Sequence, residues 1–234
     1  SAYTFSNLIS VAAGNTGTAT ISSTANAVYS GAITLDNHDL TVTCYNAGFS
    51  LTGGVTGTGN IVINATAGGI PQFATASVNN TGTITNSGSG IGSAEIAGGV
   101  GSNVTGITLN STTSALTIKT VALTVNSGGT TLTNSSGTKL LQVWGGVTGA
   151  GNLIINNNSS TDSGITLSTT SVNNTGAITN SGSGTGSVLI SAVIGANVTG
   201  VVQNSSTSQL NLSNANTFTG GVSFNAGIIN AAAL

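Results

Sequence analysis

Short runs of alternating apolar and polar residues recur along the chain, separated by clusters of Gly, Asn and Ser. Alternation with a period of two predicts strands with one buried face, and the Gly and Asn clusters predict turns. The runs expected to form strands are residues 61–63, 82–85, 116–118, 123–125, 153–155, 164–167, 177–179 and 210–212. No segment keeps a helical period over three turns, although residues 5–13 could form either a first strand or a short capping helix.

Long stretches of the sequence occur twice. The segment from Ser77 to Ser93 returns from Ser171 to Ser187 with two differences, at an offset of 94 residues. Upstream, the segment that starts at Gly53 returns at Gly145 with an offset of 92 residues. A two-residue insertion between Asn156 and Ser171 accounts for the change of offset, and insertions in repeat proteins map to loops.

This redundancy separates two all-β architectures. Strands of a β-sandwich occupy different core positions, whereas each coil of a solenoid stacks on a copy of itself and favours the same residues. We therefore predict a parallel β-solenoid with about 20 to 25 residues per coil, or rung, so that the 94-residue unit is about four rungs. The chain then has about ten rungs and forms a rod about 50 Å long.

The repeats suggest four segments. We expect an N-terminal strand or cap at residues 1–26, two long repeats at 27–120 and 121–214, and an end rung at 215–234. The few bulky residues are expected to fill wide core sections or corners; these are Phe49, Phe73, Trp144, Phe218 and Phe224. Asn79-Asn80 and their copies Asn173-Asn174 could form side-chain amide ladders along the rod, or could serve turn geometry.

The segment from Asn216 to Ile229 resembles the autotransporter-associated β-strand repeat, also called the passenger-associated transport repeat, of bacterial surface proteins. Phe218 stands at the aromatic position of that motif, Gly220-Gly221 at the first turn, and Asn225-Ala226-Gly227 at the second. The resemblance implies a right-handed parallel β-solenoid, secretion across the envelope, and a place on or outside the cell. Members are usually longer, so the chain is either a passenger fragment or a small stand-alone member.

The scarcity of charge restricts the chemistry. The 234 residues contain two Lys, no Arg, four acidic residues and one His, and only 3% of residues are charged, against about 25% in an average globular domain. Nucleic-acid binding is excluded as a main function, because phosphate contacts require many Lys and Arg. No run of 18 or more apolar residues predicts a membrane-spanning helix, so we expect no membrane insertion.

We do not expect an enzyme, a cofactor or a metal site. Polysaccharide-cleaving β-helices need clustered carboxylates, and the only cluster of ionisable groups is Asp36-Asn37-His38-Asp39. Because this cluster lies between two expected strands, at 33–35 and 40–42, we interpret it as a polar turn. Glu95 and Asp162 stand alone and have no equivalents in the other repeat copy.

Three further features are the alternating threonines, the single cysteine and the first residue of the chain. The alternating Thr residues at 16–20 and 56–58 could order water on a flat face, as an ice-binding solenoid would, but Thr is also favoured in strands for its branched side chain. Cys44 is the only cysteine, so it cannot close an internal disulfide. A chain that starts at Ser1 without Met is expected if a signal peptide has been removed.

The leading hypothesis is an extracellular structural protein whose rods stack end to end into a filament or matrix. The ends of a solenoid expose unpaired backbone groups, and no charged residue follows Asp162 to protect the C-terminal end. The partner is then a second copy, in a head-to-tail homopolymer. The residues expected at this self-assembly interface are Ile228, Ile229, Leu234, Tyr3, Phe5, Leu8 and Ile9. The runner-up is an adhesin that contacts a glycan or a host surface.

Overall fold

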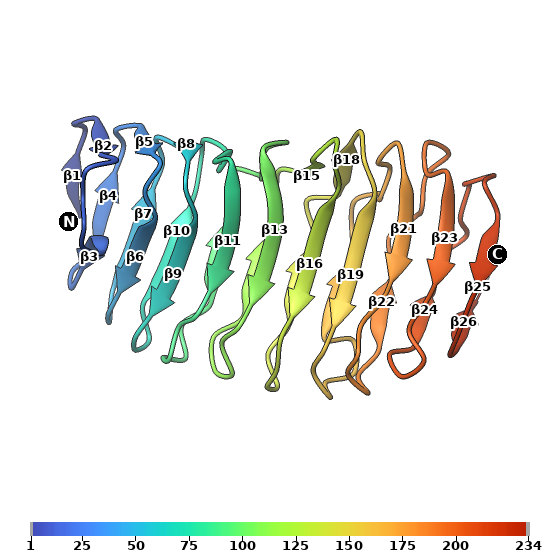
Figure 1. Cartoon of the computed structure of the whole chain (residues 1–234). Helices are drawn as coiled ribbons and strands as arrows, with labels where there is room; N and C mark the ends of the chain where they lie inside the picture. Colours follow the sequence, from blue (N-terminus) through green and yellow to red (C-terminus); the bar gives the residue numbers. More distant parts are fainter. Residues whose placement is uncertain (1, 233–234) are drawn as a thin grey trace.

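The computed structural model describes residues 2–232, which form strands and no helix. The strands stack in parallel with a repeat of about 23 residues, and the chain makes about ten turns around one axis. Figure 1 shows the rungs side by side, so that the two termini lie at opposite ends of the rod. This confirms the predicted parallel β-solenoid.

The strands lie on three faces of the rod: two faces are continuous sheets, A and C, and the third, B, has a strand in only some of the rungs. Sheet A has 11 strands, in the order of the chain. They are β1 (Tyr3–Phe5), β4 (Ala27–Tyr29), β7 (Gly48–Leu51), β10 (Ile70–Phe73), β12 (Ala94–Ile96), β14 (Leu116–Ile118), β17 (Leu141–Val143), β20 (Ile165–Leu167), β22 (Val188–Ile190), β24 (Leu210–Leu212) and β26 (Ile229–Ala231).

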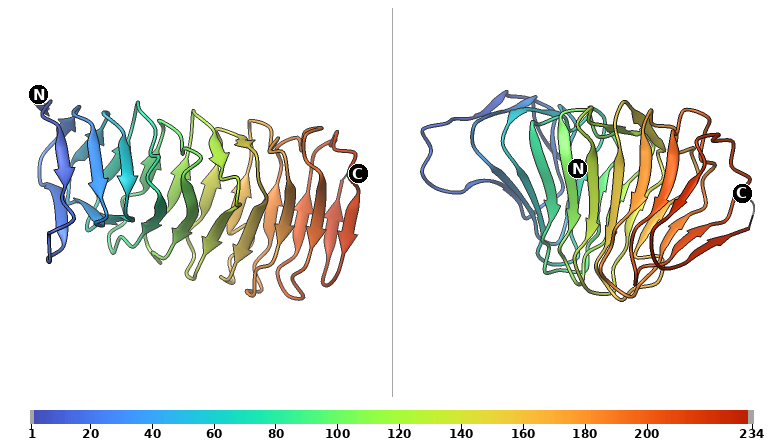
Figure 2. Two further views of the ribbon diagram at one scale, coloured as in Figure 1. Left: turned by 45° about the horizontal axis from the view of Figure 1, so that its top comes forward. Right: turned by 45° about the vertical axis from the view of Figure 1, so that its right-hand side comes forward.

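Sheet C has ten strands and covers another side of the rod, as the two views of Figure 2 show. They are β3 (Ala19–Ser23), β6 (Leu40–Cys44), β9 (Ile61–Ala65), β11 (Gly82–Asn86), β13 (Val104–Leu109), β16 (Thr130–Asn134), β19 (Leu153–Asn157), β21 (Ala177–Asn180), β23 (Gly200–Gln203) and β25 (Val222–Phe224).

Sheet B lies between A and C along the chain and is the shortest face. Its strands are β2 (Ile9–Val11), β5 (Ile33–Asp36), β8 (Val55–Thr58), β15 (Leu123–Val125) and β18 (Val147–Gly149). In the rungs without a sheet B strand, single bridges at Val78, Val100, Val172 and Ile194 continue the ladder. Residues 5–13, for which a strand and a helix were both open, contribute the end of β1 and all of β2.

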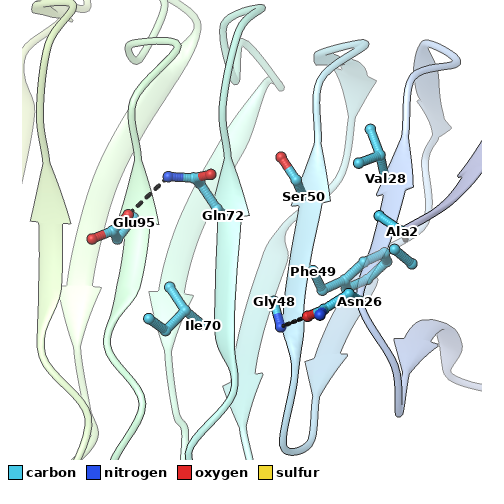
Figure 3. A pocket seen from close by; sticks show the side chains of 10 residues that line it. Ala2, Asn26, Val28, Gly48, Phe49, Ser50, Ile70, Gln72 and Glu95 are labelled. Atoms are coloured by element: carbon cyan, nitrogen blue, oxygen red, sulfur yellow. Dashed lines mark hydrogen bonds between the residues drawn. The ribbon is translucent and has the colours of Figure 1, made fainter.

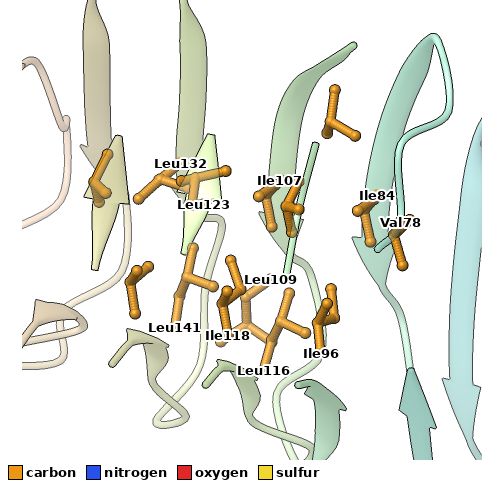
Figure 4. Close-up of a cluster of buried hydrophobic side chains, with 14 of the residues drawn as sticks. Val78, Ile84, Ile96, Ile107, Leu109, Leu116, Ile118, Leu123, Leu132 and Leu141 are labelled. Atoms are coloured by element: carbon orange, nitrogen blue, oxygen red, sulfur yellow. The ribbon is translucent and has the colours of Figure 1, made fainter. Parts of the chain in front are cut away.

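The core is a column of small branched side chains enclosed by the three sheets. Inward positions repeat from rung to rung at matching register, for example Leu116 opposite Leu141 and Ile107 opposite Leu132. Figure 4 shows this column around Ile84, Ile107 and Leu132. Burying each such side chain contributes about 1.5 to 3 kcal/mol, so the core of every rung depends on the rungs on both sides.

The bulky residues divide between the core and the surface. Phe49 and Phe73 are each only 1% exposed, as predicted, and Phe218 packs partly buried against the core. Trp144 and Phe224 do not fill the core, since they are 39% and 58% exposed; Trp144 lies just after β17, where the chain leaves sheet A. Trp144 follows the inward Val143 and therefore falls on the outward phase of the alternation, whereas Phe224 lies in the last rung of sheet C, where no further described rung covers it.

The repeat corresponds to four rungs, because β7, β10, β12 and β14 precede β17 in sheet A just as β17, β20, β22 and β24 precede β26. The two-residue insertion lies in the loop at residues 158–164, which is longer than the loop at 66–69 in the first copy. Both loops connect sheet C to sheet A. The strands and their register are therefore kept while a loop absorbs the change in length.

The most exactly repeated segment, Ser-Gly-Ser-Gly-x-Gly, forms the corner between sheets C and A. A Cβ atom on Gly90 would lie 2.2 Å from the carbonyl oxygen of Ala67 in the preceding rung, and one on Gly184 would lie 2.1 Å from that of Ser159. The following rung then bonds to this corner, since Ser114 Oγ donates to the Gly92 carbonyl at 2.6 Å and Ser208 Oγ to that of Gly186 at 2.8 Å. These residues repeat because loops stack directly on loops.

Candidate functional site

At each end of the rod, apolar side chains at inward positions are left uncovered. At the N-terminal end, Tyr3 and Phe5 in β1 pair with Ala27 and Tyr29, so they occupy the same inward register positions as the buried Phe49 and Leu51. Because no described rung precedes β1, Tyr3 is 67% exposed and Phe5 is 47% exposed. The Phe5 ring stacks on Tyr29 with centroids 5.5 Å apart.

Sheets B and C leave the same end open. Ile9 in β2 is half-buried at the inward position opposite Ile33, and Leu8 just before it is 81% exposed. A hollow at this end is lined by Ile9, Val11, Ala19, Ile21 and Leu40. Tyr3, Phe5, Leu8 and Ile9, which the sequence analysis assigns to a self-assembly interface, therefore lie together at this end of the rod, and the interface itself stays a prediction.

The C-terminal end is exposed in the same way. Ile229 is half-buried in β26 opposite the buried Leu210, and Ile228 beside it is 55% exposed. Sequence reasoning missed Val222 and Phe224, which continue the inward positions of β23. Their alternation with Ser223 was the available signal. Leu234, the remaining predicted interface residue, lies outside the described residues.

Polar side chains near the C-terminal end form short ladders along the rod axis. Asn230 Nδ2 donates to Asn211 Oδ1 at 3.1 Å on sheet A, and Asn225 Nδ2 donates to Asn204 Oδ1 at 3.3 Å after β25. In both pairs the residue nearer the C-terminal end is the donor, and the residue one rung before it is the acceptor. The Oδ1 acceptors of Asn230 and Asn225 therefore remain for a group placed beyond the end.

The repeated Asn pairs bond to the backbone of neighbouring rungs rather than to one another. The buried Asn80 donates to the Gly59 carbonyl at 2.6 Å, and its copy Asn174 donates to the Gly151 carbonyl at 2.8 Å. Asn79 Oδ1 accepts the amide of Asn103 at 2.9 Å. These bonds do not form a ladder of side-chain amides; they join the corner between sheets B and C of one rung to the adjacent rung.

The cluster at residues 36–39 forms a turn between β5 and β6, as interpreted from the sequence. Asn37 has a φ of 54°, and His38 Nδ1 lies 2.8 Å from the Asp39 carbonyl oxygen. Asp39 Oδ1 accepts the backbone amide of Asn60 in the next rung at 2.7 Å. These contacts use the cluster to hold two rungs together.

Glu95 does not stand alone, because Lys119 Nζ lies 2.6 Å from its carboxylate. Among residues 2–232, no group of three His, Cys, Asp or Glu side chains is close enough to hold a metal ion. Asp162 lies in the inserted loop. The threonines singled out from the sequence lie apart, with Thr16 and Thr18 before β3 and Thr56 and Thr58 in β8 of sheet B.

Cys44 is completely buried at the end of β6, and its thiol donates to the Ala47 carbonyl at 2.8 Å. Burial raises the pKa of the Cys44 thiol because the low dielectric disfavours the thiolate, although backbone hydrogen bonds at Ala47 and Phe49 oppose this. A protonated, buried thiol is a poor nucleophile. Cys44 therefore behaves as a small core residue.

Comparison with protein-family models, curated proteins and solved structures found no match to this chain. No helix in the described residues is long and apolar enough to cross a membrane. The features of the molecule that can indicate a function are the two ends of the rod and the side chains on its outer faces.

Proposed function

We propose that the chain is a structural rod of the cell exterior whose copies stack end to end. The observation that carries the proposal is that inward-register apolar residues are left uncovered at both ends: Tyr3, Phe5, Val222 and Phe224 are exposed and Ile229 is half-buried. A stacked copy would cover them in the way each internal rung covers the next. The resemblance of residues 216–229 to a repeat of bacterial surface proteins supports the extracellular location.

The two ends are suited to a parallel contact. If the sheet A ladder continues from β26 to β1 of a second copy, Ile229 lies opposite Tyr3 and the small Ala231 lies opposite the large Phe5. Asn230 then lies opposite Thr4, whose hydroxyl can donate to the remaining Oδ1 acceptor. The contact joins two different surfaces, so it does not close and produces a filament.

Low charge favours the same association. The net charge is −2 over 234 residues, so repulsion between copies is weak. We propose no catalysis, cofactor or metal for the chain, because the ionisable residues at 36–39 serve a turn and Glu95 is paired with Lys119. The edges of three sheets supply backbone hydrogen bonds in addition to apolar contact.

Sedimentation velocity and negative-stain electron microscopy of the purified chain test this proposal. We expect rods longer than about 50 Å that lengthen as protein concentration rises. Ile229→Lys should weaken association by at least about tenfold, because it places a charge in the contact. A chain that stays monomeric at high concentration contradicts the proposal.

The matched control is Ile91→Lys, at a residue that is 78% exposed in a loop far from both ends. It adds the same charge to the molecule and should leave association nearly unchanged. Circular dichroism of both variants checks that the fold is intact. Equal loss of association in the two variants would attribute assembly to net charge rather than to the exposed ends.

A further inference from the structure

The outer face of sheet A carries a group of polar side chains beside the only tryptophan. Gln72, Glu95, Thr117 and Gln142 occupy consecutive outward positions of β10, β12, β14 and β17. Lys119 and Trp144 are the next outward positions after β14 and β17. We call Gln72, Glu95, Lys119, Gln142 and Trp144 the sheet A patch.

Hydrogen bonds hold the charged part of this patch in place. Gln72 Nε2 donates to Glu95 Oε2 at 2.8 Å, and Lys119 Nζ lies 2.6 Å from the same oxygen. The side chains of Lys119 and Glu95 are 29% and 22% exposed, so both can still reach a ligand. Because the two charges neutralise each other, the patch favours an uncharged partner.

The other side of the patch has an unused donor and an exposed aromatic ring. Gln142 Oε1 accepts from the Thr117 hydroxyl at 3.4 Å, whereas its Nε2 makes no hydrogen bond within the described residues. The backbone amide of Trp144 donates to the Ile118 carbonyl at 2.8 Å, which places Trp144 beside Lys119 in the ladder. Its 39% exposure contrasts with the buried Phe49 and Phe73.

A shallow hollow extends the patch toward the N-terminal end. Figure 3 shows Glu95 and Gln72 at one side of the hollow and Asn26, Gly48 and Ser50 toward the other, with Ile70 also lining it. The outward residues of β4 and β7 that line the hollow are Val28, Gly48 and Ser50, and Gly48 has no side chain to fill it. Together, the hollow and the patch form a strip that crosses successive strands about 4.8 Å apart.

We propose that this strip binds a neutral, linear polysaccharide lying along the rod axis. Amide, carboxylate, ammonium and hydroxyl groups supply the paired donors and acceptors that sugar hydroxyls need. An exposed indole offers an apolar face for the C–H face of a sugar ring, while its N–H remains available as a donor. Strand spacing is close to the rise of one sugar unit in an extended chain, so equivalent side chains meet successive units.

The inference does not depend on stacking of the ends, because the strip lies on the side of the rod. Trp144 is the only tryptophan in the sequence, so its fluorescence reports on the strip alone. We would titrate the full chain, at concentrations where it is monomeric, with the hexasaccharides of β-1,4-linked glucose, xylose, mannose and N-acetylglucosamine. A saturable change of emission with at least one of these probes is expected.

Variants locate the binding site by calorimetry. Gln142→Ala should weaken binding of the responding hexasaccharide about threefold to tenfold, as expected for the loss of one or two hydrogen bonds. Trp144→Ala should weaken it by more than about tenfold, since it removes the aromatic platform. The control, Asn64→Ala, removes an outward amide from sheet C and should bind as the unmodified chain does.

Three results would overturn the inference. No response of Trp144 to any of the four probes would mean that the strip does not bind neutral glycans. An equal loss of affinity in Asn64→Ala and Gln142→Ala would place binding elsewhere. Tighter binding of an oligogalacturonate than of every neutral probe would contradict the proposed class of ligand.

Discussion

Glycines at the corner between sheets C and A show how a single atom can decide whether rungs stack. In the segment that follows β11, Gly90 lies so close to Ala67 of the preceding rung that any side chain would overlap its backbone. The obstacle is a rigid backbone rather than the end of a flexible side chain. The Ser-Gly-Ser-Gly-x-Gly segment is therefore constrained at its glycines by contact between rungs.

Replacing Gly90 by Ala tests this constraint. A Cβ atom would lie 2.2 Å from the oxygen and 2.3 Å from the nitrogen of Ala67, so the loops must separate. We expect a loss of about 1 to 3 kcal/mol in the free energy of unfolding, as for other overpacked sites. Gly68→Ala is the control, because no heavy atom lies within 4 Å of its added Cβ. Similar denaturant midpoints for both variants would contradict the argument.

At the scale of the strand, buried Asn side chains at the ends of sheet C strands are bonded to the start of a later sheet A strand. Asn134 and Asn157 end β16 and β19 with no exposed surface, and they donate to the carbonyls of Gly164 and Ser187 at 2.9 and 2.8 Å. Each bond gives a second donor to a carbonyl directly before a sheet A strand, because the carbonyls of Gly164 and Ser187 also accept the backbone amides of Leu141 and Gly164. The side-chain amides of Asn134 and Asn157 thus fix where β20 and β22 begin.

Asn134→Ala should remove two such bonds, to the carbonyls of Lys139 and Gly164, both at 2.9 Å. The Gly164 carbonyl keeps the backbone amide of Leu141 at 3.0 Å, whereas the Lys139 carbonyl loses the donor described here. Loss of these bonds in a closed corner costs about 1 to 3 kcal/mol, so we expect the free energy of unfolding to fall by that order. Thr133→Ala, at the adjacent outward position, should change it by less than about 0.5 kcal/mol. Urea unfolding followed by circular dichroism measures both, and matching losses would mean that the amide bonds contribute little.

The strands were the most predictable elements. Alternation in residues 61–63, 153–155 and 210–212 identified β9, β19 and β24, because inward and outward positions follow a strict period of two. Assignment to three faces could not be predicted, since it depends on corners whose angles arise from contacts between rungs. Burial of Asn134 could not be predicted either, because its polar side chain is buried only by stacking of the neighbouring loop.

Some of the exposed residues could be named from the sequence, and others could not. Tyr3, Phe5 and Ile229 were recognised as end residues, because apolar side chains near the ends of a repeat array have fewer neighbours. Trp144 was expected in a wide core section or a corner for its size, although its alternation with Val143 indicated the outer face. The position of Glu95 beside Lys119 could not be inferred, because the two are joined only when β12 and β14 lie side by side.

For the whole molecule, the scarcity of charge predicts how stability depends on pH. Only four acidic side chains and one His can titrate between about pH 3 and 8, so unfolding changes proton binding little in that range. We expect a nearly constant melting temperature in acid and neutral solution. A steep fall near pH 4 would contradict this.

Alkaline solution should differ, because burial raises the pKa of the Cys44 thiol in the folded state. The stabilisation from keeping this thiol protonated is complete below its ordinary pKa in the unfolded chain. It is then lost as pH rises toward the raised folded pKa, because only the unfolded chain ionises in that window. Cys44→Ala should have a flatter melting curve against pH there, measured by scanning calorimetry, and an unchanged slope would contradict the assignment.

The insertion at residues 158–164 has a consequence for how such a molecule can change over generations. A gene duplication that spans whole rungs would lengthen the rod, because each added rung can pair with similar rungs on both sides. Drift could then accumulate at the corners without disturbing the interior. Related proteins would then differ in length by whole rungs while keeping the same fold.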